Sequence, residues 1–336
     1  MYTFNTPGPI DVLVQNRAGR IEINATDTAT STVELTTMNG GSDAQGVIDD
    51  ATVELNDRKL VVKLQQKRRG LLRWKPMQIA VAITVPTGSS VTCEADSADI
   101  TTSGELRSAR LSTGSGDVTV DVVTGPLVTK SGSGDVTIAS SHESLESSTG
   151  SGDVRIGSAV QRAVLKSGSG DVSLAHGTGT IEAKTGSGDI ELSEVRGDIT
   201  AKTGSGDVRI DAITSGRTQA ATGTGDIRVG VVNGTAAWLD LNTVTGDVRN
   251  DLEDAGAPAD GDETVELHIK TATGDIATTR ASKDSTIDHT TEMIARQQQE
   301  QLRRHTGQPA VDREPLRRRA ARSLHHLARA IDTDDI

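Results

Sequence analysis

A short motif, Gly-Asp followed by Val or Ile, recurs along the middle of the chain at a fixed spacing. Its aspartate occupies every eighteenth position, at Asp117, Asp135, Asp153, Asp171, Asp189 and Asp207. Asp99 extends this register backward, and Asp226, Asp247 and Asp275 follow at intervals of 19, 21 and 28 residues. A fixed period of this length is typical of repeat proteins, in which each unit buries its apolar face only by stacking on its neighbours.

Each period contains two strand signals. The first follows the aspartate, as in Val118-Thr119-Val120, where aliphatic residues occupy the first and third positions and a polar residue lies between them. The second comes half a period later, as at Leu127 and Thr129. Alternation with a period of two indicates a strand with one buried face. The sequence therefore predicts an all-β parallel β-solenoid, a two-sided β-helix with 18-residue coils.

Glycine precedes every aspartate of the strict repeats and is predicted to form a structural turn. These glycines suit the positive-φ conformations of tight corners, which cost glycine little. They are Gly116, Gly134, Gly152, Gly170, Gly188 and Gly206.

The aromatic residues are very few, at 1% of the chain, so the core must be thin and built from smaller aliphatic side chains. We expect one β-solenoid domain over residues 1–280, with irregular coils at 1–98, strict repeats at 99–225 and irregular coils again at 226–280. Residues 281–336 shift to Arg, Gln, His and Leu at helical spacing, which predicts a short α-helical, basic C-terminal tail.

The chain carries a net charge of −12, which argues against nucleic acid as its partner, because contacts to phosphate dominate that kind of affinity. The first residues lack the basic start and apolar run of a signal peptide, and no stretch approaches the ~20 apolar residues of a membrane span. These features predict a cytoplasmic protein, with peripheral attachment to the inner face of the membrane as an alternative.

Two columns of charge follow from the register. The aspartates Asp117, Asp135, Asp153, Asp171, Asp189 and Asp207 form one carboxylate per coil. Calcium could neutralise such a ladder, but we favour carboxylates that accept hydrogen bonds from backbone N–H groups of their own turn, and we expect no cofactor. Lys130, Lys166, Lys184 and Lys202 share one outward position, interrupted by Ser148, and form either a solvated surface or an anion-binding ladder.

Two segments interrupt the repetitive chemistry. Residues 66–76 place basic side chains among Leu and Trp, a composition that suits an anionic membrane surface or a protein partner. The contact candidates there are Arg68, Arg69, Leu71, Leu72, Arg73, Trp74 and Lys75. In the tail, Arg317, Arg318 and Arg319 are candidates for the same contacts. The alternatives are a loop folded back on the body and a tail that caps the last coil.

The repeated Thr-Gly-Ser-Gly-Asp-Val, the segment AITVPTGSSVT from Ala82 and the opening F-x-x-P-G-P-I-D-V resemble the bacterial toast-rack, or putative-adhesin, β-strand-repeat family. The resemblance covers roughly residues 1–280 and implies a non-catalytic β-solenoid associated with the cell envelope or with stress responses. The family is a domain of unknown function, so the resemblance supplies no catalytic residues.

These observations predict a protein that is not an enzyme. Identical coils offer no irregular group of acids, histidines or lysines for catalysis, since an acid/base pair needs two different environments. We expect a scaffold or binding module of adhesin-like type, which presents repetitive faces to a protein or envelope partner. The alternative is a peripheral membrane-associated envelope-stress protein that uses the 66–76 loop and the Arg-rich tail. Uncapped ends of the solenoid could also pair with other copies.

Overall fold

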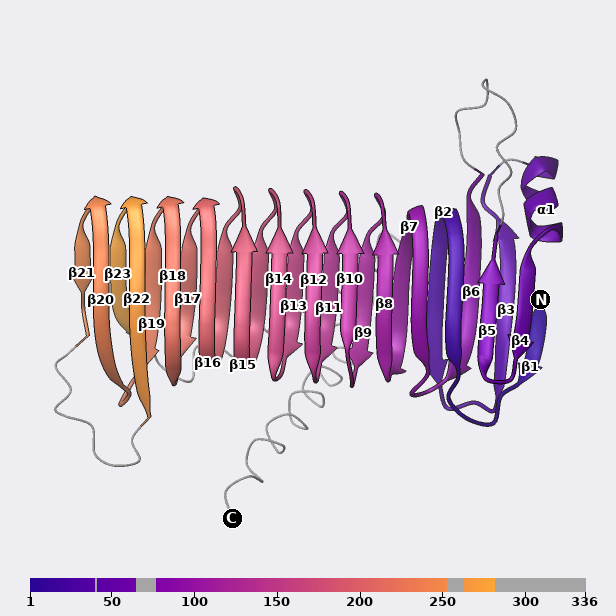
Figure 1. Cartoon of the computed structure of the whole chain (residues 1–336), viewed down its shortest axis with the longest axis horizontal. Helices are drawn as coiled ribbons and strands as arrows, with labels where there is room; N and C mark the ends of the chain where they lie inside the picture. The colour runs from indigo at the N-terminus through magenta and orange to yellow at the C-terminus, as the bar shows by residue number, and fades with distance from the viewer. Residues whose placement is uncertain (40, 65–76, 253–262, 282–336) are drawn as a thin grey trace, which may run out of the picture. The chain divides into compact units, whose positions relative to one another are not determined.

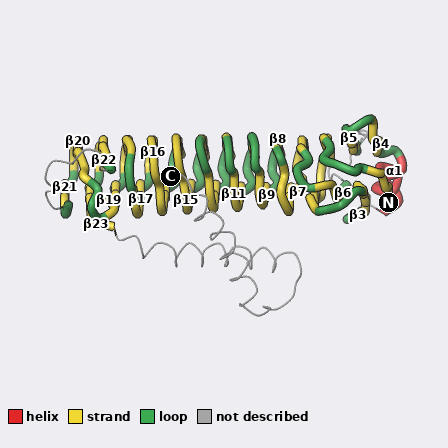
Figure 2. Tube along the Cα trace, turned by 90° about the horizontal axis from the view of Figure 1, so that it is seen from below, coloured by secondary structure: helices red, strands yellow, loops and turns green. Residues whose placement is uncertain are grey.

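The computed structural model describes residues 1–39, 41–64, 77–252 and 263–281, all within a compact unit at Met1–Ala281. Within these ranges the chain is built almost wholly from strands, with one helix, α1, at Gly41–Asp49. The all-β prediction is confirmed. Figure 1 shows the strands of this unit side by side in an elongated stack, and Figure 2 shows the loops that join them.

The strands form two rows, which we call row A and row B, and the chain alternates between them. In the repeats, row A contains β8 (Ser108–Thr113), β10 (Leu127–Ser131), β12 (Ser144–Thr149), β14 (Arg162–Ser167) and β18 (Gly216–Thr224). Row B contains β9 (Val118–Val123), β11 (Val136–Ser141), β13 (Val154–Ala159), β17 (Val208–Ile213) and β19 (Ile227–Val232). The long strands β15 (Val172–Thr185) and β16 (Ile190–Ser205) bend through both rows, with their first halves in row B.

Neighbouring strands of a row are parallel and lie one sequence period apart. Leu127 pairs with Leu145 in row A, and Val136 pairs with Val154 in row B, each a shift of 18 residues. The register slips by one residue between β17 and β19, where a bulge lies between Ile210 and Ile213. The spacing of the aspartate motif therefore corresponds to the spacing of the paired strands.

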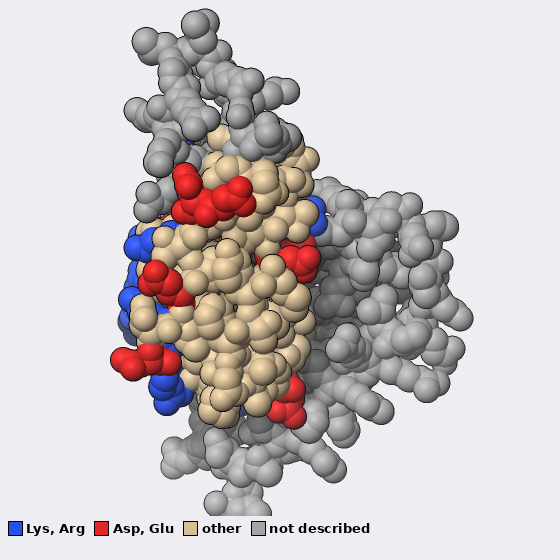
Figure 3. Space-filling model, turned by 90° about the vertical axis from the view of Figure 1, so that its right-hand side faces the viewer, with Lys and Arg blue, Asp and Glu red and all other residues tan. Residues whose placement is uncertain are grey.

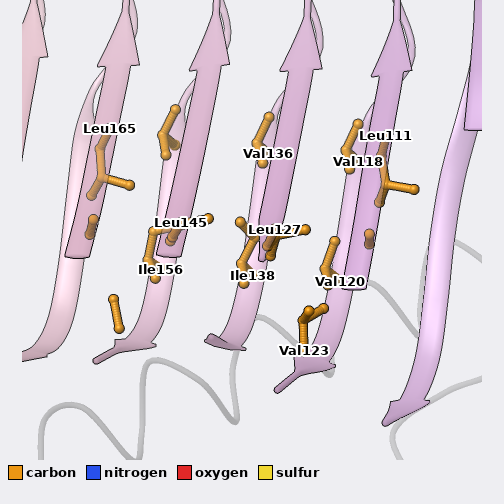
Figure 4. Close-up of a cluster of buried hydrophobic side chains, with 14 of the residues drawn as sticks. Leu111, Val118, Val120, Val123, Leu127, Val136, Ile138, Leu145, Ile156 and Leu165 are labelled. Carbon is orange, nitrogen blue, oxygen red and sulfur yellow. The ribbon is translucent and has the colours of Figure 1, made fainter. Parts of the chain in front are cut away.

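The core lies between the rows. It consists of every second residue of each strand, the residues whose side chains point toward the other row. Figure 4 shows Leu111, Leu127 and Leu145 from row A facing Val120 and Ile138 from row B, and all are 1% exposed or less. Some inward positions are polar, and one pair of them is hydrogen-bonded within the core: the buried Thr129 Oγ1 donates to Ser147 Oγ at 2.9 Å. Small aliphatic side chains suffice here because the two rows are close, which explains the scarcity of aromatic residues.

The corner glycines have a different role from the one predicted. Gly116, Gly134, Gly152, Gly170 and Gly188 do not adopt the left-handed backbone conformation, and only Gly206 has a positive φ, at 158°. Glycine is required because the chain of one repeat lies directly on the next. A Cβ on Gly134 would lie 2.0 Å from the carbonyl oxygen of Gly116, and the other five glycines meet the preceding repeat equally closely.

The N-terminal end departs from the expected irregular coils. Two strands still run through both rows, β2 (Asp11–Thr26) and β7 (Ser90–Leu106), and they pair in parallel. Beyond them, row A ends with β5 (Lys59–Lys63) and antiparallel β4 (Thr52–Asn56). Row B ends with β6 (Ile79–Pro86), then antiparallel β3 (Thr30–Thr37) and β1 (Tyr2–Asn5).

At the C-terminal end the order of repeats in space differs from their order in the sequence. The last strands, β22 (Thr264–Thr273) and β23 (Ile276–Ala281), pair with β18 and β19. The preceding strands, β20 (Ala236–Thr245) and β21 (Val248–Asn250), lie outside them at the end of the stack (Figure 1). In this order the inward Ile269 and Ile276 of the inner repeat are fully buried, whereas the inward Val248 of the outermost repeat is 47% exposed.

Candidate functional site

The aspartate column is a continuous hydrogen-bonded ladder along the corners of the stack. The Oδ1 atom of each aspartate accepts the backbone N–H of the aspartate one repeat later, at 2.8–3.1 Å from Asp99 to Asp207. The ladder continues through Asp226, Asp275 and Asp247, in the spatial order of the last repeats. The carboxylates do bond backbone N–H groups, but the expectation that these groups lie in the same turn is wrong, because each N–H belongs to the next repeat.

Arginines on row B contact the other oxygen of several of these carboxylates. Arg155 is paired with Asp153 and, at 3.2 Å, with Asp135, and Arg228 lies 2.9 Å from Asp226 Oδ2. Within the described ranges, no three His, Cys, Asp or Glu side chains come together as a metal-binding group. Arginine thus offsets the charge of Asp135, Asp153 and Asp226 within the column.

A second column, of buried hydroxyl groups, accounts for the Ser or Thr that opens each motif. The hydroxyl of Ser131 donates to the carbonyl of Gly116 at 3.0 Å and accepts the N–H of Gly134 at 2.9 Å. Thr149, Ser167 and Thr185 repeat both contacts one repeat at a time. These hydroxyl groups provide hydrogen-bond partners for the backbone N–H and C=O groups at the corners, where the chain leaves the strand pairing. The sequence analysis did not identify them.

The lysine column lies on the outer surface of row A. Strand pairing aligns Lys130 with Ser148, Ser148 with Lys166, and then Lys184 and Lys202 in succession. Lys130, Lys166 and Lys202 are exposed, and Lys184 is half-buried with its Nζ 2.6 Å from Glu182 Oε1. The hydrogen bond from Lys184 holds the pKa of Glu182 below its usual range. Three ammonium groups therefore lie on directly opposed positions of adjacent strands.

The last repeats carry a cluster of different chemistry on row A, which we call the C-terminal patch. It contains Arg217 of β18, Glu266 and His268 of β22, and Trp238 and Asp240 of β20. A guanidinium nitrogen of Arg217 lies 2.7 Å from Glu266, and His268 lies 2.8 Å from Glu266 and 3.3 Å from Asp240. The ring of Trp238 is tilted against that of His268 at 5.1 Å between centroids.

The two carboxylates favour the protonated form of His268. The hydrogen bond to Glu266, and then that to Asp240, raises the pKa of His268 above its ordinary value. Hydrogen bonds from His268 and Arg217 lower the pKa of Glu266 in turn. The cluster is thus an outward network of ion pairs beside an exposed indole. The sequence signal that could have located it is Trp238, the only aromatic residue in the part of the chain that follows the strict repeats.

Several predicted contact residues lie outside the described part of the chain. These are Arg68, Arg69, Leu71, Leu72, Arg73, Trp74 and Lys75 of the 66–76 loop, and Arg317, Arg318 and Arg319 of the tail. The strands that flank the loop, β5 and β6, belong to the N-terminal end. None of the described helical residues forms a segment long and apolar enough to cross a membrane.

A family model described as Toastrack DUF4097 matches the chain at residues 11–231 and again at 165–308. No curated protein is significantly similar.

Among solved structures, a putative adhesin from Bacteroides fragilis NCTC 9343 is 14% identical over 82% of this chain and 95% of its own, with a TM-score of 0.32. A putative adhesin from Parabacteroides distasonis ATCC 8503 is 13% identical over 82% and 95%, with a TM-score of 0.30. A putative cell adhesion protein from Clostridium sporogenes ATCC 15579 is 10% identical over 83% and 98%, with a TM-score of 0.23.

Proposed function

The chain belongs to the Toastrack family, and we propose that it is a non-enzymatic binding module of adhesin-like type. We infer that its body is a two-sided parallel β-solenoid, in which each 18-residue repeat is one coil and rows A and B are its two faces. The outer surfaces of the rows carry the same side-chain types at a regular spacing. Such a surface suits a partner that is itself extended and repetitive, either a protein segment or a polymer of the envelope.

The observation that carries this proposal is the alignment of Lys166, Lys184 and Lys202 on neighbouring strands. Like charges directly opposite each other destabilise a sheet, and neighbouring strands lie only ~4.8 Å apart. Glu182 compensates one of the three ammonium groups. Repulsion within the column would lower the stability of the sheet, which supports a role for these lysines in recognition of an anionic chain.

The column indicates the chemistry of the partner. Ammonium groups at a spacing of ~4.8 Å match carboxylates or phosphates that repeat along an extended chain. Each lysine contributes a point charge rather than a shaped pocket, so the expected affinity is modest per site and grows with the number of coils engaged. The partner is thus an acidic protein segment or an anionic envelope polymer.

Binding of the full chain to poly-glutamate and to an anionic polysaccharide tests the proposal. We expect the triple variant Lys166→Gln, Lys184→Gln and Lys202→Gln to bind at least one of these polymers about tenfold more weakly than the wild type, by loss of charge contacts. The matched control is Arg209→Gln, Arg228→Gln and Arg249→Gln, which removes the same charge from row B, where each arginine is paired with an aspartate.

Retained affinity in the control and loss in the lysine variant would support the lysine column as the contact. Equal loss in both variants would show that only net charge matters, and the proposal would then fail. Absence of binding by the wild type to either polymer at low salt would also contradict it.

A further inference from the structure

The two rows end differently at the C-terminal end of the stack. Row B ends in β21, which spans only Val248–Asn250, and the inward Asn250 is hydrogen-bonded to Thr278 at 2.7 Å. Row A ends in β20, which spans Ala236–Thr245. Among the described strands, β20 pairs only with β22, so its other edge presents backbone N–H and C=O groups along ten residues. Native proteins rarely leave a long edge strand in this state without a partner.

The side chains of β20 are also incompletely covered. Trp238 is 56% exposed and Val244 is 81% exposed, although both are large and apolar. The inward Leu239 and Leu241 are only half-buried, whereas Leu267 and Ile269, which occupy the same positions one repeat inward, are fully buried. A further strand laid along β20 would bury this surface and continue the core.

The N-terminal end does not offer the complementary surface. Its rows are closed by the short antiparallel strands β1 and β4, and α1 contacts β3. Figure 3 looks onto this end and shows acidic side chains scattered over it. Head-to-tail stacking would therefore place β20 against edges of four and five residues.

The sequence of β20 is complementary to itself when it is reversed. With Leu241 opposite Leu241 of a second copy, Trp238 lies opposite Val244, and Asp240 lies opposite Asn242. The two most exposed apolar side chains thus become cross-strand neighbours, and no like charges oppose each other. The inward Leu239 of each copy lies opposite Thr243 of the other, on the core side.

We propose that two copies of the chain associate through β20, which pairs antiparallel with itself about a two-fold axis at Leu241. Such an interface is isologous and closed, so association stops at the dimer. Row A then runs without interruption from one copy into the other, and the two lysine columns become parts of one surface. This inference does not depend on the identity of the partner or on the binding role of the lysines.

The oligomeric state of the full chain tests the dimer, measured by light scattering after size exclusion at tens of micromolar protein. The wild type should have twice the 35.1 kDa mass of one chain. Val244→Lys should shift the mass to that of a monomer, because a lysine on an edge strand opposes further pairing. Ala272→Lys is the matched control: Ala272 is exposed at the same position of β22, one repeat inward, and this variant should remain a dimer.

A second variant tests the register. Oxidised Leu241→Cys should yield a covalent dimer on a non-reducing gel, because only residue 241 lies opposite its own copy, whereas Ala272→Cys should not. The native Cys93 is buried and does not interfere. A monomeric wild type, or a dimer that survives Val244→Lys, would overturn the proposal. Masses that grow with concentration beyond the dimer would indicate head-to-tail stacking and would also overturn it.

Discussion

At the scale of single residues, the motif Ser/Thr-Gly-Ser-Gly-Asp describes how one repeat rests on the next. The opening hydroxyl group satisfies the corner backbone, and the aspartate accepts an N–H from the next repeat. The second glycine lies where the chains approach most closely, and any side chain there would meet the backbone beneath it. Each position of the motif thus corresponds to one contact between neighbouring repeats.

Gly134→Ala tests this interpretation of the glycines. The added Cβ would lie 2.0 Å from the carbonyl oxygen of Gly116, so the two repeats must separate. Overpacking of this kind costs about 1–3 kcal/mol, and we expect a lower thermal midpoint by circular dichroism. Gly8→Ala is the control, because a Cβ at Gly8 has no atom within 4 Å. If both variants unfold at the same temperature as the wild type, close stacking does not explain the glycines.

At the scale of elements, the aspartate ladder joins the corners of adjacent repeats through hydrogen bonds. Asp171 illustrates this, since its Oδ1 accepts the N–H of Asp189 at 2.8 Å. Asp171→Asn keeps an acceptor oxygen, whereas Asp171→Ala removes it. We therefore expect the alanine variant to lose about 1–2 kcal/mol in the free energy of unfolding and the asparagine variant to lose less.

Thermal unfolding of the wild type in calcium and in a chelator tests whether the aspartate column binds this ion. We expect the same midpoint with either, because backbone N–H groups already occupy one oxygen of each carboxylate. A rise in the midpoint with calcium that Asp171→Asn abolishes would show instead that the column binds the ion.

The strands could be predicted from the sequence, but not all of their partners could. Period-two alternation marks a strand and its inward face, so Val118, Val120 and Leu127 were correctly expected to be buried. The same alternation occurs in parallel and antiparallel strands, which is why the antiparallel closure at β3 and β4 was not foreseen. Helix α1 was also missed, because its sequence, GSDAQGVID, contains two glycines and has the composition of a loop.

The order of the last repeats could not be read from the chain either. A motif indicates that a repeat exists but not which repeat it contacts, so the sequence does not show that β22 pairs with both β18 and β20. The C-terminal patch depends on this order, because Glu266 and His268 meet Trp238 and Asp240 only when β22 lies beside β20. The sequence analysis therefore placed its contact candidates in the 66–76 loop and the tail, and it did not identify the C-terminal patch.

At the scale of the whole described unit, the stacking contacts lie inward and at the corners, and the outward positions are not needed for them. The inward side chains and the corner columns repeat in every layer, which frees the outward positions to vary. Lysine occurs on row A at Lys166, Lys184 and Lys202, and among the described strands β20 has one unpaired edge. Dimerisation at that end would double the number of lysines that a long anionic partner can contact and would raise its avidity.

The central claim is that 18 residues form one interchangeable layer, and deletion of a single layer tests it most directly. Removal of residues 154–171 joins Asp153 to Val172 and leaves every remaining motif in register. We expect this variant to unfold cooperatively with a thermal midpoint close to that of the wild type. Removal of residues 154–172 leaves a repeat of 17 residues, which places Ser173 inward and Leu174 outward, and it should unfold at a much lower temperature. Equal midpoints for the two deletions, or failure of the first to fold, would contradict the account.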